Sequence, residues 1–417
     1  MAGSTIDHLI ATTIFIAALL IFISLFNQTI QTAILYQRNK AIATKCSDLL
    51  DNMLLNPGYP LEYDEGGNPV EWGKLNCTPT IFGLQDPEFT QYRLSPFSLM
   101  RLRSAVGDPI YYYKTDLWYS NITMGFGNFL LVSFDKVLNY SYVAQLLGIN
   151  GTYGFRLTVT PIINVSISKL HSNPLTFSIS VKGGDFPINN ATVSYCLLRV
   201  EPGGGEEAYP AFTVDYGVNY TDIKGLATLS FPTIDETQDS YALIVYASSC
   251  GLRGVGYYEH ILDQGKYAIP LISDFSENGC EIILAHSWDI RGGDSAEIKY
   301  NATLLLLTED FTFRSIPLDD DEASGHLNSG EGQPYASITI PFHSPSILVI
   351  TYSKSATETG IILMPWGINA MAFPVVFGGS PSEATWVATD IRNVLVGDIA
   401  YRVKLELWSL EGYEVRG

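Results

Sequence analysis

The stretch AHSWDIRGGD, residues 285–294, holds the residue types in this sequence that are best suited to catalysis. His286 and Asp289 lie three positions apart and Arg291 follows, a combination that could perform acid–base chemistry. The end of a strand followed by a polar turn explains the same residues without any chemistry. No G-x-S-x-G, H-E-x-x-H, Walker loop or G-x-G-x-x-G opening a helix occurs, and the six histidines do not cluster. We therefore expect no enzyme and no cofactor.

Two further groups of residues raise the question of metal binding. The run Asp319 to Glu322 offers hard oxygen ligands for calcium, but it lacks the alternating spacing of a calcium loop. A solvated acidic loop within residues 317–333 is the simpler interpretation. The cysteines form no C-x-x-C pair, so a zinc cluster is not expected.

Aromatic residues gather in one short stretch. Rings of this kind could stack on the apolar faces of sugars, and ordinary packing within a β-sheet would explain them equally well. The residues are Tyr111, Tyr112, Tyr113, Trp118 and Tyr119.

Composition narrows the class of protein. Apolar residues make up 47% of the 417 and charged residues 16%, which fits a well-packed chain and excludes wholesale disorder. The 25 tyrosines, 20 phenylalanines and 36 glycines favour strands joined by many turns. The net charge of -19 disfavours a nucleic-acid partner, because phosphates would be repelled.

An uncharged apolar run from Leu9 to Phe26 opens the chain. As a helix it would be roughly 27 Å long, which matches the core of a bilayer. A cleaved secretory signal is the alternative, but it requires a basic region and a small-residue cut site, and neither is present. Apolar residues then continue at three- and four-residue steps to Leu55, and Pro57-Gly58 ends the pattern. We expect one helix, about 80 Å long, that is membrane-spanning first and amphipathic afterwards.

This opening resembles the archaeal type IV pilin-like proteins with a class III signal over about residues 1–75. The likeness rests on GSTID (3–7), the apolar helix, its amphipathic continuation, LLNPGYP (54–60) and EWG (71–73). It implies a cut after Gly3, which leaves Ser4 as the new amino terminus, and an assembly role for Asp7. Self-assembly into a filament through the helix would follow. Alternatively, Asp7 lies in the headgroup region beside an uncut anchor.

The charge around the span and the composition of the chain give opposite topologies. Arg38, Lys40 and Lys45 follow the span and would hold the large C-terminal part inside the cell under the positive-inside rule. Long domains often cross regardless of charge, and the acidic composition fits the exterior. We predict a single-pass membrane protein with extracellular C-terminal domains.

The remaining sequence is predicted to be mainly β in three units. A small α+β head occupies 57–161, an Ig-like β-sandwich 162–260 and a second β-sandwich 261–417, behind the helix of 1–56. The stretches at 181–195 and 224–232 resemble bacterial and archaeal Ig-like surface repeats, which implies the sandwich alone. The apolar run from Gly360 to Gly379 contains two prolines, so a buried strand pair suits it better than a second span.

Cysteines and sequons also favour an oxidising exterior. We expect disulfides among the five cysteines, with a Cys46–Cys77 bridge joining helix to head. The disulfide candidates are Cys46, Cys77, Cys196, Cys250 and Cys280. The sequons that could carry N-linked glycans in the predicted exterior part are Asn76, Asn121, Asn139, Asn150, Asn164, Asn190, Asn219 and Asn301, and Asn27 lies in the helix.

Two hypotheses follow for function. The first is a membrane-anchored, pilin-like archaeal cell-surface protein with a structural or adhesive role, whose partner on a surface or glycan is not specified by the sequence. The second is an extracellular ligand- or glycan-binding ectodomain, or a hydrolase with a site near His286 and Asp289.

Overall fold

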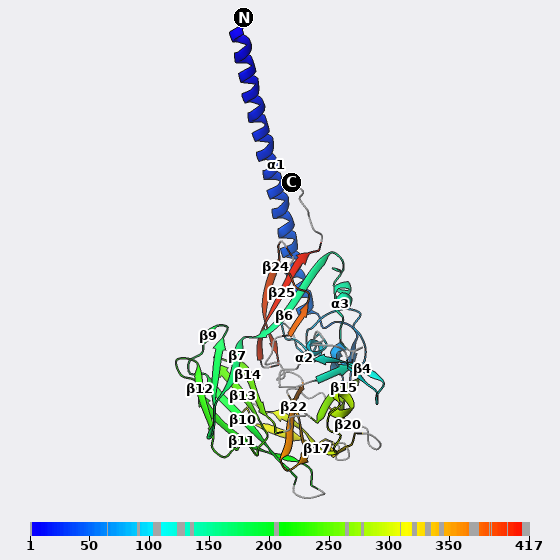
Figure 1. Cartoon of the computed structure of the whole chain (residues 1–417). Helices are drawn as coiled ribbons and strands as arrows, with labels where there is room; N and C mark the ends of the chain where they lie inside the picture. The colour runs from blue at the N-terminus through cyan, green and yellow to red at the C-terminus, as the bar shows by residue number, and fades with distance from the viewer. Residues whose placement is uncertain are drawn as a thin grey trace.

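The computed structural model is a β-rich body from which one long helix projects (Figure 1). This confirms the predicted fold class, mainly β behind a long N-terminal helix. The structure describes residues 2–64, 66–89, 92–102, 110–122, 130–133, 137–203, 208–262, 267–276, 279–308, 310–318, 323–329, 335–341, 346–366, 375–382, 384, 386–397 and 399–410.

Helix α1 runs unbroken from Ala2 to Leu55. It ends where the sequence predicts, because Pro57 cannot continue it and Gly58 adopts a left-handed φ of 81°. The Gly58 amide donates to Asn56 Oδ1 at 2.9 Å, which closes the turn. Only the last turns are buried in the body, through Ile42, Cys46, Leu49, Leu50, Met53 and Leu54.

The buried end of α1 packs on a four-stranded antiparallel sheet. Its order is β23 (Val375–Gly378), β6 (Tyr153–Pro161), β25 (Ile399–Ser409) and β24 (Ala388–Val396). The central pair β6 and β25 joins segments more than 240 positions apart, with Val159 opposite Val403. The C-terminal strands therefore form the surface against which the N-terminal helix is held.

Short elements around Trp72 complete the region below the helix. They are β1 (Leu61–Tyr63), β2 (Pro69–Glu71), the 3-10 turn η1 (Trp72–Lys74), α2 (Pro96–Met100) and α3 (Tyr140–Leu146). Trp72 is fully buried and its indole N–H donates to Gly83 O at 2.9 Å. The buried Arg101 guanidinium donates to the carbonyls of Trp72 and Leu75 at 2.6 and 3.0 Å. These bonds satisfy a charge that would otherwise be costly to bury.

Residues 163–260 form two antiparallel sheets that pack as a β-sandwich. One sheet contains β12 (Leu226–Phe231), β8 (Leu175–Gly183) and β7 (Ile163–Ser172), with β9 (Phe186–Pro187) beside β8. The other contains β11 (Ala211–Tyr220), β10 (Thr192–Glu201), β13 (Tyr241–Ser249) and β14 (Leu252–His260). Alternate residues of β8 point inward, and Phe177 shares one buried core with Val193 and Leu243 of the other sheet.

Two more sheets fill the other side of the body. The first has the order β20 (Tyr335–Ile340), β16 (Gly279–His286), β15 (Ala268–Ser276), β5 (Leu130–Ser133), β4 (Leu117–Ile122) and β3 (Ile110–Tyr112). The second has β18 (Phe313–Ile316), β17 (Ile298–Leu307), β21 (Ser346–Ser355) and β22 (Glu358–Trp366), with β19 (Ser324–Leu327) on β17. The short helix α4 (Ser287–Arg291) follows β16.

Strand pairing crosses the predicted domain boundaries. The parallel pair of β5 and β15 joins the predicted head to the predicted second sandwich, and β6 joins the head to β25. The apolar run 360–379 supplies parts of two strands, as expected, but they do not pair with each other. Strand β22 pairs with β21 and β23 pairs with β6.

Candidate functional site

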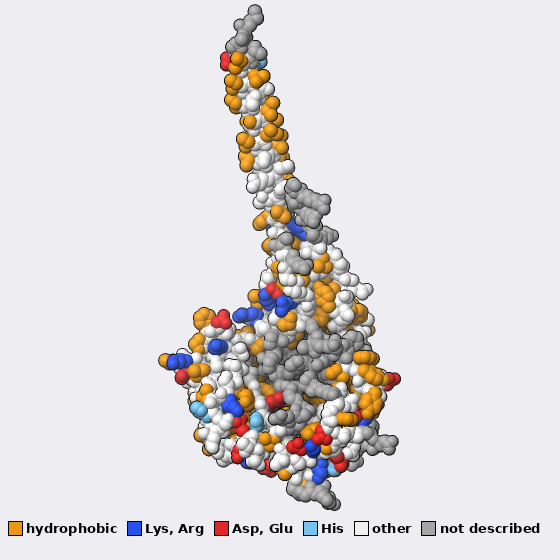
Figure 2. All heavy atoms as spheres, in the orientation of Figure 1, with side chains coloured by type: hydrophobic (Ala, Val, Ile, Leu, Met, Phe, Trp, Pro, Cys, Tyr) orange, Lys and Arg blue, Asp and Glu red, His pale blue; other side chains and the backbone are white. Residues whose placement is uncertain are grey.

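The first part of α1 stands free of the other described parts of the protein. Every described side chain from Ile6 to Gln37 is exposed, and Leu9 and Phe22 are 70% and 68% exposed. Figure 2 shows hydrophobic side chains around this part of the helix. By length and composition the helix could cross a bilayer, a test that a signal sequence near the N-terminus would also meet. An apolar surface of this size needs lipid or another apolar surface to cover it.

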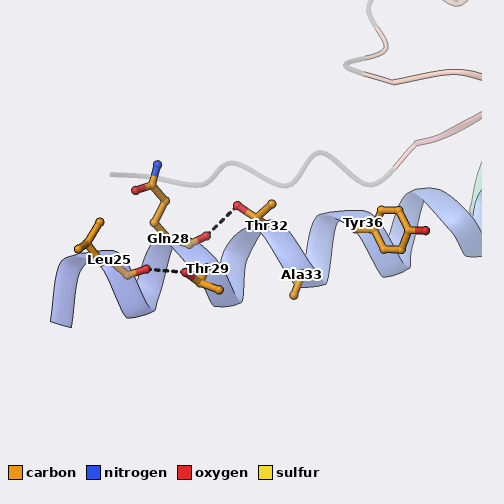
Figure 3. A pocket seen from close by; sticks show the side chains of 6 residues that line it. All are labelled: Leu25, Gln28, Thr29, Thr32, Ala33 and Tyr36. Carbon is orange, nitrogen blue, oxygen red and sulfur yellow. Dashed lines mark hydrogen bonds between the residues drawn. The ribbon is translucent and has the colours of Figure 1, made fainter. Parts of the chain in front are cut away.

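Hydroxyl groups on this exposed helix are satisfied from within. Thr12 and Thr13 donate to the carbonyl oxygens of His8 and Leu9, each at 2.8 Å. Further along, Thr29 and Thr32 make the same four-residue bond to Leu25 O and Gln28 O at 2.8 Å, and both bonds are drawn in Figure 3. A hydroxyl that bonds to its own helix costs less to place in lipid.

A shallow hollow lies on one side of α1 where the apolar run ends (Figure 3). It is lined by Leu25, Gln28, Thr29, Thr32, Ala33 and Tyr36. All its lining side chains come from a single helix and none carries a charge. The hollow is therefore a feature of the helix surface and has no group suited to catalysis.

The second part of α1 is fixed to β24 by charged groups. Arg392 Nε donates to Asp51 Oδ1 at 3.0 Å, and its Nη2 donates to Ser47 Oγ at 3.1 Å. Its Nη1 donates to Asp390 Oδ1 at 2.6 Å, and Tyr92 OH donates to Asp51 Oδ1 at 3.3 Å. The hydrogen bonds that Arg392 donates to Asp51 and then to Asp390 raise the pKa of Arg392 above its ordinary value. We call Ser47, Asp51, Tyr92, Asp390 and Arg392 the clamp.

The predicted Cys46–Cys77 bridge is wrong. Cys46 faces the sheet, with its Sγ 3.5 Å from Leu405 O and 3.8 Å from Ala388 O. Cys77 lies in a separate loop, whose carbonyl accepts a hydrogen bond from Arg101 at 2.5 Å. None of the five cysteines forms a disulfide, so the predicted disulfides are absent.

Burial makes three of these thiols weak acids. It raises the pKa of Cys46 to about 11 and that of Cys196 to about 12, and it raises the pKa of Cys280 well above its ordinary value. Cys77 is half-buried. Cys250 is exposed at the turn between β13 and β14.

Gly3 and Ser4 lie in the first turn of α1, and Asp7 is exposed a turn further on. A helical backbone at this point is compatible with an intact anchor and with the rod left after a cut. The cut after Gly3 and the assembly role of Asp7 therefore stay predictions.

His286 is a structural residue in this fold. Its side chain is fully buried, and its Nδ1 accepts a hydrogen bond from the Trp288 amide at 3.1 Å, which caps α4. Nε2 lies 2.9 Å from Ala296 O, to which it donates as the neutral tautomer. Burial lowers the pKa of His286 below its ordinary value. Both ring nitrogens are occupied, so neither is available to move a proton to or from a substrate.

Asp289 is also engaged within the protein. Its Oδ2 lies 2.7 Å from Lys114 Nζ, and the two side chains are only 1% and 7% exposed. Tyr113 OH donates to Asp289 Oδ1 at 3.0 Å. The two residues expected to act as an acid–base pair therefore have structural roles. His286 caps α4, and Asp289 links α4 to the β3–β4 hairpin. Lys114, which makes the tie, has no sequence signal that distinguishes it from a surface lysine.

The aromatic stretch divides into two sets across the β3–β4 hairpin. Tyr112 and Tyr119 are fully buried, as ordinary β packing predicts. Tyr111, Tyr113 and Trp118 are 42%, 56% and 55% exposed. Figure 2 shows hydrophobic side chains gathered over β4 at the side of the body. Strand alternation separates the two sets, so this stretch packs into the core on one face and leaves an open surface on the other.

The sequons differ in accessibility. Exposed side chains belong to Asn27, Asn76, Asn139, Asn150, Asn164 and Asn190. Asn219 and Asn301 are half-buried within β11 and β17, and Asn219 Nδ2 donates to Thr228 O at 2.8 Å. The side chain of Asn121 lies outside the described residues. Glycans at the exposed sites would need no rearrangement of a strand.

The acidic run Asp319 to Glu322 lies outside the described residues. Within the described ranges, no group of three or more His, Cys, Asp or Glu side chains could hold a metal ion.

A polar hollow that the sequence did not signal is lined by Glu297, Lys299, His326, Ser353 and Lys354, among others. His326 Nδ1 lies 2.8 Å from Glu297 Oε1, and Lys354 is held by Asp294 and Glu358 at 2.6 and 3.0 Å.

A scan against protein-family models found no matching family, and a search of curated proteins found no matching relative. Among solved structures, the chain is similar to Escherichia coli alpha-2-macroglobulin activated by porcine elastase. That match is 10% identical with a TM-score of 0.17, over 57% of this chain and 23% of that chain. Red sea bream transglutaminase is 8% identical with a TM-score of 0.19, over 60% and 37%. The chain thus spans well under half of either protein, and similarity this low carries no argument about function.

Proposed function

We propose that the chain is a membrane-anchored, pilin-like protein of the cell surface, with a structural or adhesive role. Its β-rich body lies outside the cell, and its N-terminal helix is the segment through which copies would assemble. The observation that carries this proposal is the division of one unbroken helix into a fully exposed apolar part and a part buried against the body.

The dimensions of α1 support this arrangement. Leu9 to Phe26 is long enough for a bilayer core, and residues 27–41 add roughly 22 Å of helix before the first buried residue, Ile42. The clamp then holds the helix to β24. A rod that is continuous through these three parts would hold the body at a fixed distance from the membrane.

The absence of a catalytic role is part of the proposal. The histidine and carboxylate that best suited an enzyme are both engaged in holding α4. Structural and adhesive surface proteins require no active site. A hydrolase centred on His286 and Asp289 is not supported.

Protease added to intact cells that express the full chain tests the topology. We expect the β-rich body to be removed from the surface, while a cytoplasmic marker protein in the same cells stays intact until lysis. If the body survives until the cells are lysed, the topology is reversed and the surface role is lost.

Mass spectrometry of the native amino terminus tests processing: a chain that starts at Ser4 supports pilin-type cleavage, and one that retains Gly3 supports an anchor alone.

The second candidate, an extracellular ligand- or glycan-binding ectodomain, is favoured by one observation. The outward face of the β3–β4 hairpin exposes two tyrosines and a tryptophan. The two candidates are compatible, because an adhesive surface protein needs a binding face.

A further inference from the structure

Three exposed rings lie on the β3–β4 hairpin, and two of them are in contact. Tyr111 lies directly opposite Trp118 in the strand register, with ring centroids 5.3 Å apart and planes tilted by 44°. Tyr113 follows at the start of the turn after β3 and is 56% exposed. We call these three residues the aromatic platform. Nothing about ordinary β packing requires three large rings on the outward face of an edge hairpin.

The platform is held in place from beneath. Tyr112 and Tyr119 are buried against Ile269, Leu271 and Ile283 of β15 and β16. Thr115 Oγ1 lies 3.1 Å from Tyr119 OH, within the turn that joins the two strands.

The same hairpin is fixed sideways to α4. The ion pair of Lys114 with Asp289 is almost fully buried, and Tyr113 OH donates to the same carboxylate. A ligand would therefore meet rings that are already ordered, so that binding loses little side-chain entropy.

Polar groups border the rings. Asp116 Oδ1 accepts a hydrogen bond from Tyr111 OH at 2.6 Å, which places a carboxylate beside the Tyr111 ring. Asp116 has a left-handed φ of 57° in the turn. Aromatic faces with carboxylate and hydroxyl groups at their border match a pyranose sugar, which presents apolar C–H faces and donates hydrogen bonds from its hydroxyls.

Other occupants fit less well. Among the described residues, the exposed rings are three side chains, far less than the roughly 800 Å² that a stable protein partner covers. An anionic ligand or headgroup would meet Asp116 and a chain of net charge -19. A neutral sugar chain requires neither a large interface nor a basic one.

We propose that the aromatic platform binds a neutral polysaccharide, with sugar rings stacked on Trp118 and Tyr111 and hydroxyls bonded to Asp116. This inference deepens the adhesive role proposed above and rests on it, because it supplies the class of partner to which the protein would adhere.

Binding is measured with the full chain in detergent, by calorimetry and tryptophan fluorescence. The probes are a soluble β-1,3-glucan, chitohexaose and α-mannan, with a high-mannose glycoprotein as a separate arm. We expect at least one of the three free saccharides to bind, and Trp118→Ala to weaken that binding about tenfold or more, as for a central contact residue. Trp118→Phe, which retains a ring, should restore part of the affinity.

Tyr63→Ala is the matched control, because Tyr63 is 67% exposed on β1 and lies outside the platform. It should bind as the unchanged chain does. Circular dichroism establishes that each variant is folded, and Tyr111→Ala replaces Trp118→Ala if the latter is not.

Three results would overturn the inference: no binding to any of the free saccharides, equal binding by the folded platform variants, or binding to the glycoprotein alone. If protease removes the body from intact cells but the protein binds no saccharide, the saccharide-binding proposal is rejected and the surface role stands. If the protein binds saccharide but its body resists protease on intact cells, the platform proposal stands and the proposed topology is rejected.

Discussion

Asp51 on the N-terminal helix and Arg392 near the C-terminus form a two-point ion pair, with Arg392 Nε 3.0 Å from Oδ1 and Nη2 3.2 Å from Oδ2. The pair joins positions 341 apart in sequence. It fixes the direction in which α1 leaves the body, because Arg392 sits on β24 and β24 packs along the helix. The proposed stand-off from the membrane depends on this attachment.

Removing the pair should loosen the helix from β24. We expect Asp51→Asn and Arg392→Met each to destabilise the protein, and the double-mutant cycle to give a coupling of about 1 kcal/mol. The value is modest because Asp51 is 38% exposed and Arg392 25%, so that water screens the pair. Denaturant unfolding in detergent measures the coupling.

Asp48→Asn is the control for this cycle. Asp48 lies on the exposed side of the same helix, three residues before Asp51. It should show no coupling to Arg392. A coupling with Asp48 as large as that with Asp51 would mean that long-range charge, and not the two-point contact, holds the helix.

The helix was predictable, and its attachment was not. Apolar residues at three- and four-residue steps from Ile42 to Leu54 set the buried face, and Pro57 set the end. Local alternation also marks β8, where every second residue from Leu175 to Val181 is buried. The pairing of β6 with β25 has no local signal, because two strands far apart carry the same alternation as any other antiparallel pair. The clamp and the crossed domain boundaries both depend on that pairing.

Titration of His286 should make the protein less stable in mild acid. Its folded pKa lies below the ordinary 6.5, so the unfolded chain takes up a proton first as the pH falls. Stability is thus present above about pH 6.5 and is lost as the pH falls toward the lower folded pKa. His286→Asn keeps a cap acceptor for α4 without the titrating ring. Unfolding followed from pH 7 to 5 should show a loss of stability that the variant lacks. An equal decline in both chains would assign the loss to other groups.

Asp86 should act in the opposite direction. Burial raises the pKa of Asp86 from 3.8 to about 6, so the folded protein holds this proton more tightly than the unfolded chain does. Stability therefore falls as the pH rises from about 4 to about 6 and remains lower above that range. Asp86→Asn should remove this dependence and stabilise the protein at pH 7 by about 1–3 kcal/mol. The difference in unfolding free energy between the two chains, measured at pH 4 and pH 7, checks this. A variant that is less stable at pH 7 would contradict it.

Thiol reactivity should separate the five cysteines. Only a thiolate reacts readily with maleimide, and a pKa of about 11 leaves Cys46 almost entirely protonated at pH 8. We expect Cys250 to be labelled first, the half-buried Cys77 more slowly, and Cys46, Cys196 and Cys280 after unfolding. Peptide mass spectrometry measures the order. Rapid labelling of Cys46, or a non-reduced peptide that joins Cys46 to Cys77, would contradict the structure.

The chemistry suggested by His286 and Asp289 illustrates what spacing alone leaves undetermined. Because His286 and Asp289 are three positions apart, the sequence predicts that they lie close together. It does not show which other residues bond to their polar atoms. Ala296 follows on the next loop, and Lys114 lies more than 170 residues earlier. Strand alternation could predict that some rings of the aromatic stretch are exposed. It could not predict the pairing of strands in the sheet that holds these rings in place.

The Lys114–Asp289 ion pair should stabilise the β3–β4 hairpin, which carries the platform, more than it stabilises the rest of the fold. Lys114→Met leaves a carboxylate that is 1% exposed without its cation, a change that typically costs about 3–5 kcal/mol when such a pair is buried. Asp289→Asn in the same chain should recover much of that loss, because the unpaired charge is then gone. Hydrogen exchange followed by mass spectrometry should show the lost protection concentrated in residues 110–122, since the pair ties that hairpin to α4. Lys299→Met is the control, as Lys299 lies on β17 outside the hairpin. Equal loss of protection across β8 and β13 in the Lys114 variant would mean that the pair supports the whole fold, and the platform would then have no tie of its own.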